Sequence, residues 1–88
     1  MVATVAALAL ILTIHVQRRL AARQLPMDWI ERTVRQPDWP SPDPKRPGLT
    51  RSYRAIPEAG GRVLRVVHRP LGPDILVVTV FLDRGARR

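Results

Sequence analysis

The chain has 88 residues, a length that limits it to one domain. It contains no cysteine, which excludes disulfides, a thiolate zinc site and a cysteine nucleophile. Fifteen basic residues against seven acidic ones give a net charge of +8, and every basic residue except Lys45 is arginine. This balance favours an anionic partner such as nucleic acid, a membrane surface or an acidic protein.

The N-terminal segment, residues 2–14, is apolar apart from two threonines. It is shorter than the roughly 20 residues of a membrane-spanning helix, and the basic segment that precedes the apolar part of a signal peptide is lacking. No glycine or proline interrupts residues 1–25, and an apolar residue recurs every fourth position at Leu8, Leu12, Val16 and Leu20. We therefore predict that residues 1–14 form an apolar extension that begins a buried helix. A membrane anchor through residues 2–14 is the alternative.

The first helix is predicted to end near Gln24, because Pro26 disfavours helical backbone at the residue before it. A second helix follows with Pro26 in its first turn, and Pro37 ends it. Two acid-first pairs at i,i+4 support this helix: Asp28 with Arg32, and Glu31 with Arg35. Its predicted inward face consists of Trp29, Ile30, Thr33 and Val34.

Residues 37–48 contain five prolines, a density that excludes a helix or a central strand. We predict a stiff, extended connector that Trp39 holds against the body of the domain. After it, strands are expected at residues 49–56, 62–69 and 75–82, separated by glycine- and proline-containing turns. The last strand is apolar on both faces apart from Thr79, so Val78 and Val80 should be fully buried.

These elements predict the α+β class: two N-terminal helices packed on a three-stranded antiparallel β-meander, with the Pro-rich connector between them. The single domain is expected to cover residues 15–88, and no internal repeat is present.

Several segments in this order resemble a family of small bacterial proteins known as domain of unknown function 4258. The similarity runs from about residue 14 to residue 88 and is carried by His15-Val-Gln-Arg-Arg19, Trp29-Ile-Glu-Arg-Thr-Val, Gly61-Arg-Val-Leu-Arg-Val-Val67 and the strand from Val77 to Arg84. The shape of this family, helices followed by an antiparallel sheet, resembles that of the RelE and BrnT toxins. Those toxins are ribonucleases that a partner antitoxin neutralises. The resemblance implies an RNA substrate and an antitoxin-like protein partner, by analogy of fold only.

Metal-independent RNA cleavage needs a base for the 2′-hydroxyl, an acid for the leaving oxygen, and cations at the phosphate. The candidate catalytic residues are His15 and Tyr53, and for each of them a purely structural role is the alternative. The candidate residues for binding RNA or another anion are Arg19, Arg23, Arg54, Arg65 and His68. No metal and no cofactor is expected, because the sequence contains neither a metal-ligand motif nor a glycine-rich phosphate loop.

We therefore expect a toxin-like bacterial protein of the cytoplasm that binds RNA, or cleaves it as a metal-independent endoribonuclease. One alternative is a non-catalytic module that binds protein or nucleic acid through the same basic surface. The other is a small membrane-associated protein anchored by residues 2–14.

Overall fold

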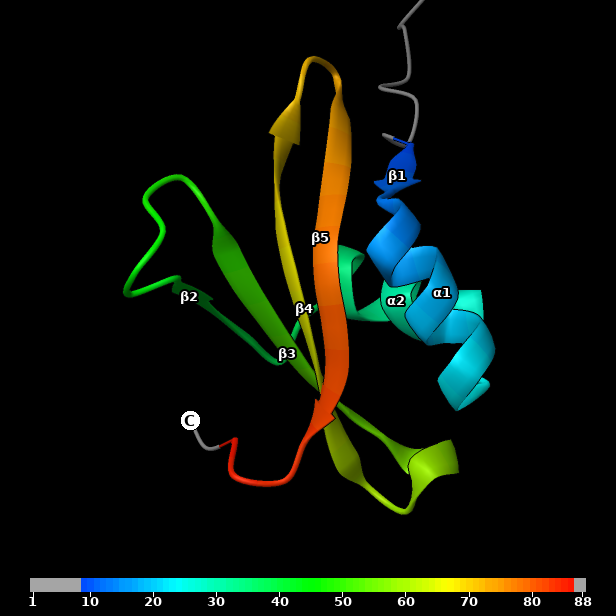
Figure 1. The fold of residues 1–88 in the computed structure, drawn as a ribbon. Coiled ribbons are helices and arrows are strands. Elements are labelled where there is room, and N and C mark those ends of the chain that lie inside the picture. The colour runs from blue at the N-terminus through cyan, green and yellow to red at the C-terminus, as the bar shows by residue number, and fades with distance from the viewer. Residues whose placement is uncertain (1–8, 87–88) are drawn as a thin grey trace, which may run out of the picture.

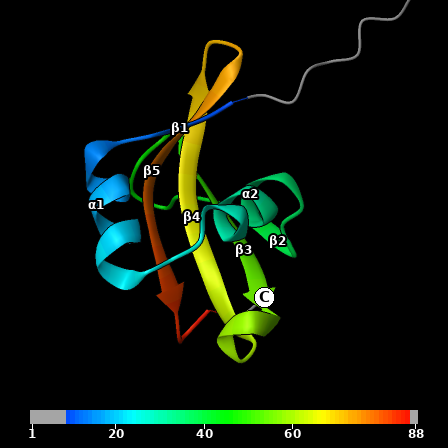
Figure 2. The ribbon, with the colours of Figure 1, turned by 90° about the vertical axis from the view of Figure 1, so that its right-hand side faces the viewer.

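A computed structural model describes residues 9–86 of the chain. The elements in chain order are β1 (Leu10–Leu12), α1 (Ile14–Arg23), α2 (Met27–Arg35), β2 (Trp39–Pro42), β3 (Thr50–Ile56), β4 (Arg62–Leu71) and β5 (Asp74–Asp83), with a 3-10 turn at Pro57–Ala59. The strands form one sheet in the order β1-β5-β4-β3-β2 (Figure 1). Both helices pack on the same face of this sheet, the helix face (Figure 2).

The α+β class is confirmed, but the sheet is a five-stranded mixed sheet and not a three-stranded meander. The predicted meander is present as β3, β4 and β5. The first added strand, β1, lies parallel to β5 with Leu10 opposite Ile75. The second, β2, lies antiparallel to β3 with Trp39 opposite Tyr53. β2 can form inside the Pro-rich connector because it is an edge strand. Prolines lack the backbone N–H that donates a hydrogen bond to a neighbouring strand, and only an edge strand tolerates this loss.

The start of α1 also differs from the prediction. Leu10–Leu12 are extended in β1, and the helix begins only at Ile14. Thr13 is the N-cap: its side-chain oxygen accepts a hydrogen bond from the backbone N–H of Val16 at 3.2 Å. The predicted helix over residues 1–14 is therefore wrong for residues 10–12, and residues 1–8 lie outside the described part. The predicted end at Gln24 is confirmed, with Gln24 in the left-handed conformation at φ 53°.

Helix α2 agrees with the prediction, except that Pro26 is its N-cap rather than part of its first turn. Both predicted ion pairs form, Arg32 with Asp28 at 2.9 Å and Arg35 with Glu31 at 2.6 Å. Arg32 also pairs with Glu58 at 2.9 Å, which links α2 to the turn before β4. The predicted inward face is confirmed: Ile30 and Thr33 are fully buried, while Trp29 and Val34 are partly buried against the same core.

Near its middle, β5 contains a β-bulge, directly after the residues that pair with β1. Val80 lies opposite Val66 and Val77 lies opposite His68, so Val78 is an extra residue in β5. The bulge turns both Val77 and Val80 to the helix face, where both are fully buried with Val16, Ile30 and Leu64. The predicted burial of Val80 is confirmed. That of Val78 is wrong, because Val78 is only partly buried at the bulge.

The loop between β2 and β3 is closed by the carboxylate of Asp43. It accepts hydrogen bonds from the backbone N–H groups of Lys45 at 2.9 Å and Arg46 at 3.0 Å. It also pairs with the guanidinium of Arg51 at 3.3 Å. These bonds, led by that from the Lys45 N–H, lower the pKa of Asp43 to about 2. The carboxylate therefore remains ionised well below pH 4 in the folded protein.

Asp43→Asn is expected to lower the melting temperature at pH 7 but to matter much less near pH 2. The pKa of Asp43 is lower in the folded state than in the unfolded chain, so its stabilisation is present above about pH 4 and is lost as the pH falls through about 2. Thermal melts of both proteins from pH 2 to 7 measure this. A difference in melting temperature that does not change with pH would contradict the role of the charge.

Candidate nucleic-acid interface

A cleft of about 540 Å³ lies at the end of the sheet where β4 begins and β5 ends. We call it the arginine cleft; it is lined by Arg19, Arg23, Leu25, Arg62, Phe81, Leu82 and Arg84. In the described part of the chain β1 pairs with β5 only as far as Val77, so no strand covers the outer edge of β5 beyond that residue. The arginine cleft opens along this edge, between the sheet and the C-terminal half of α1.

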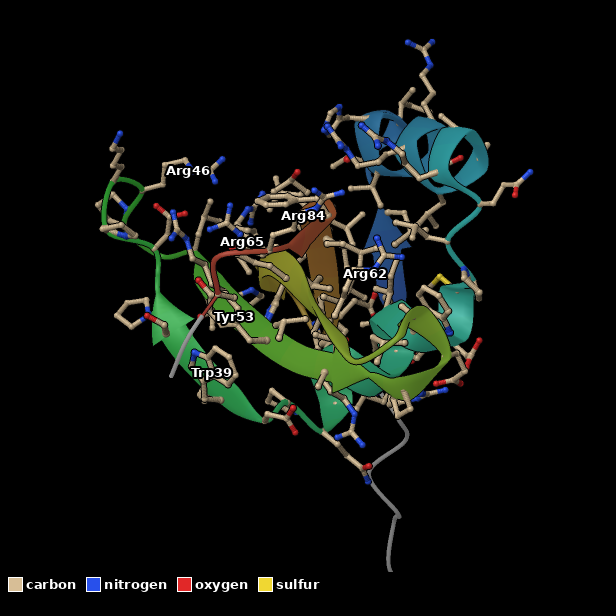
Figure 3. The ribbon with its side chains drawn as sticks, turned by 90° about the horizontal axis from the view of Figure 1, so that it is seen from below. Trp39, Arg46, Tyr53, Arg62, Arg65 and Arg84 are labelled. Atoms are coloured by element: carbon tan, nitrogen blue, oxygen red, sulfur yellow. The ribbon has the colours of Figure 1, made fainter. Side chains whose placement is uncertain are left out.

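Three segments bring the four arginines together. Arg19 and Arg23 are one helical turn apart on α1 and so share one of its sides. Arg62 is the first residue of β4 and Arg84 follows the last residue of β5. Because β4 and β5 are antiparallel, with Val63 opposite Asp83, these two residues meet at one end of the sheet (Figure 3).

The positive charge of the arginine cleft is not neutralised within residues 9–86. No acidic residue lines it, and Arg19, Arg23 and Arg84 form no ion pair with a described residue. The Nε of Arg19 is buried and lacks a hydrogen-bond partner there. Arg62 uses one donor, its Nε, in a 3.0 Å hydrogen bond to the carbonyl of Ala59. Arginines grouped in this way attract an anion and offer it many hydrogen-bond donors.

His15 lies beside this site. A shallower depression on the exposed side of α1 is lined by His15, Arg18, Arg19, Ala22 and Arg23. It shares Arg19 and Arg23 with the arginine cleft, so His15 borders the same arginines. Of the seven residues proposed from the sequence, His15, Arg19 and Arg23 are therefore brought together.

Tyr53 and Arg65 lie on the opposite face of the sheet from the helices. They belong to a row of four directly paired residues on adjacent strands, Trp39, Tyr53, Arg65 and Phe81. The first three are labelled in Figure 3. The rings of Trp39 and Tyr53 stack with centroids 4.7 Å apart, and the guanidinium of Arg65 lies 4.0 Å from the centre of the Phe81 ring. Tyr53 is only 8% exposed, and the sheet separates it from His15. Phe81 is the member of this row that also lines the arginine cleft.

Arg54 and His68 lie on the helix face, away from the arginine cleft. The guanidinium of Arg54 donates a hydrogen bond to the carbonyl of Gln36, at the C-terminal end of α2. The Nε2 of His68 is 2.7 Å from the hydroxyl of Ser52, and burial lowers the pKa of His68. Both side chains therefore connect elements of the fold.

Arg62 and Arg84, by contrast, were not identified from the sequence, although the predicted hairpin of β4 and β5 already placed its two ends together.

Residues 9–86 contain no group of three or more histidine, aspartate or glutamate side chains placed to hold a metal ion. Within the same range, none of the helices has the length and apolar character needed to cross a membrane. The segment proposed as a membrane anchor, residues 2–14, lies mostly outside the described residues.

Comparison with known proteins places the chain in a family. Searches of curated proteins and of solved structures find no match to it. A family described as Domain of unknown function (DUF4258) matches residues 12–82, which begins at the last residue of β1 and covers both helices, β2, β3, β4 and nearly all of β5. The resemblance drawn from the sequence is thus confirmed, and the chain belongs to the DUF4258 family.

Proposed function

We propose that this protein binds single-stranded RNA through the arginine cleft. The observation that carries the proposal is the group of four arginines around one cleft without an acidic residue in its lining. Arginine binds phosphate oxygens with a planar fork of donors, which makes it the usual residue for recognising a nucleic-acid backbone. The net charge of +8 adds long-range attraction for a polyanion.

The size of the site favours a single strand over a duplex. The arginine cleft, at about 540 Å³, has the volume of a pocket that encloses one small ligand, enough for a nucleotide or two but not for a double helix. The apolar side chains Leu25, Phe81 and Leu82 line it together with the arginines, and unstacked bases pack on such surfaces. The resemblance to RelE and BrnT toxins that the order of elements in the sequence suggests favours RNA over DNA, by analogy of fold only.

Arg23→Gln and Arg84→Gln are each expected to weaken RNA binding about 3- to 10-fold, and to reduce the slope of log affinity against log salt by about 0.7 per lost phosphate contact. Fluorescence anisotropy with a labelled single-stranded RNA at several salt concentrations measures both quantities. Arg69→Gln is the matched control, since it removes the same charge from an exposed arginine near the other end of β4. Equal losses in all three variants, or none in any, would contradict binding at the arginine cleft.

A second candidate function, RNA cleavage, is favoured by the position of His15. His15 lines a depression that shares Arg19 and Arg23 with the arginine cleft. An RNA phosphate held by these two arginines would lie next to an imidazole, the side chain that enzymes use most often as a general acid or base.

If His15 is the general acid or base, His15→Ala should abolish cleavage while RNA affinity changes less than about twofold. One sample of the variant serves for melting temperature, RNA affinity and cleavage of an end-labelled RNA in the presence of a chelator. His15 is exposed, so the melting temperature should stay close to that of the parent. A clear loss of stability would assign His15 a structural role. If the parent protein does not cleave the RNA, the cleavage activity is contradicted and RNA binding alone remains.

A further inference from the structure

We infer that the arginine cleft recognises the phosphorylated end of an RNA strand, a terminal phosphomonoester, in preference to the phosphodiesters within the strand. The inference rests on the proposed RNA-binding function and names the part of the RNA that occupies the site.

The first reason is the balance of charge. Four guanidinium groups line the arginine cleft and no carboxylate does. An internal phosphodiester brings one negative charge and two non-bridging oxygens. A terminal phosphomonoester brings a charge of about −1.5 to −2 and three acceptor oxygens. The terminal phosphate therefore neutralises more of the positive charge of the four guanidinium groups and accepts hydrogen bonds from more of their N–H donors.

The second reason is an unsatisfied donor in the wall. The Nε of Arg19 is buried and has no hydrogen-bond partner among the described residues. Buried polar groups in native proteins are nearly always paired, with protein, ordered water or an ion, so this donor needs an acceptor. The Nε atoms of Arg54 and Arg65, which do not line the arginine cleft, are unpaired in the same way, so this reason adds to the charge balance and does not stand alone. A third phosphate oxygen supplies an acceptor that an internal phosphodiester lacks.

The third reason is the shape and lining of the site. Its volume suits a single terminal nucleotide better than a strand running through it. Phe81, Leu25 and Leu82 give the arginine cleft an apolar side on which the sugar and base of that nucleotide can pack. One face of the Phe81 ring is already occupied by the guanidinium of Arg65, 4.0 Å from the ring centre, which holds the ring in place.

The test compares RNAs of one sequence and about ten nucleotides that differ only at their ends. One carries hydroxyl groups at both ends, one a 5′-phosphate and one a 3′-phosphate. A hydroxyl-ended RNA that is two nucleotides longer controls for charge, because it gains similar negative charge through phosphodiesters alone. Dissociation constants are measured by competition against a labelled RNA at fixed salt.

We expect one phosphorylated RNA to bind about tenfold more tightly than both hydroxyl-ended RNAs. The 5′ and 3′ forms show which end is recognised. Arg84→Gln and Arg19→Gln should remove this preference, and Arg69→Gln should keep it. Equal affinity of the phosphorylated RNAs and the longer hydroxyl-ended RNA would overturn end recognition while leaving RNA binding intact. If both cleft variants still prefer the phosphorylated RNA, the terminal phosphate binds outside the arginine cleft and the inference is wrong. Absence of binding by every RNA would overturn the proposed function itself.

Discussion

Val80→Asp is expected to unfold the protein at room temperature. Val80 is fully buried on the helix face of β5, where it packs in the core with Val16, Val66 and Ile30. Desolvating an unpaired carboxylate there costs several kcal/mol. A domain of this size has a total stability of only about 5–15 kcal/mol. Far-UV circular dichroism and a thermal melt would show a loss of the cooperative transition.

Ile14→Asp is the matched control for this substitution. It also replaces a β-branched apolar residue by aspartate, but Ile14 is 59% exposed. It stands in the first turn of α1, which contains no acidic residue and where a negative charge interacts favourably with the helix dipole. Its melting temperature should stay close to that of the parent. A cooperative melt of Val80→Asp near the parent temperature would show that the register of β5 is wrong.

Ile30→Ala is expected to reduce the free energy of unfolding by about 2–5 kcal/mol. Ile30 is fully buried between α2 and the sheet, and its removal leaves a cavity that the surrounding strands cannot fill. Urea denaturation followed by tryptophan fluorescence measures the change at constant m-value.

The same substitution at Ile14 separates burial from helix propensity. Ile14→Ala removes an exposed side chain and introduces a better helix former, so its effect should stay within about 0.5 kcal/mol. Losses of similar size at Ile30 and Ile14 would show that α2 does not pack on the sheet as described.

Local interactions were readable from the sequence because they join residues that are close in the chain. Helix α2 and its ion pairs, Asp28–Arg32 and Glu31–Arg35, depend on i,i+4 spacing alone. The end of α1 at Gln24 depends on Pro26 two residues later. The hairpins of β3, β4 and β5 depend on apolar runs separated by turns.

Half of the candidate site was also visible in this way. Arg19 and Arg23 lie on one side of α1 because of helical spacing, and His15 lies one turn earlier on the same side. Sequence spacing, however, does not show which face of the sheet a strand residue occupies. Tyr53 was grouped with His15 on the basis of charge and residue type, but strand alternation puts it on the face opposite the helices.

What the sequence by itself determined, then, is the α+β class, helix α2, the three meander strands and the arginines of α1. Only the tertiary structure decided that Leu10–Leu12 form a strand, because pairing with β5 outweighs a weak local preference for helix. It also decided the bulge at Val78 and the meeting of Arg62 and Arg84 with α1. These features depend on hydrogen-bond register between distant segments, and a shift of one residue reverses the face that every side chain occupies.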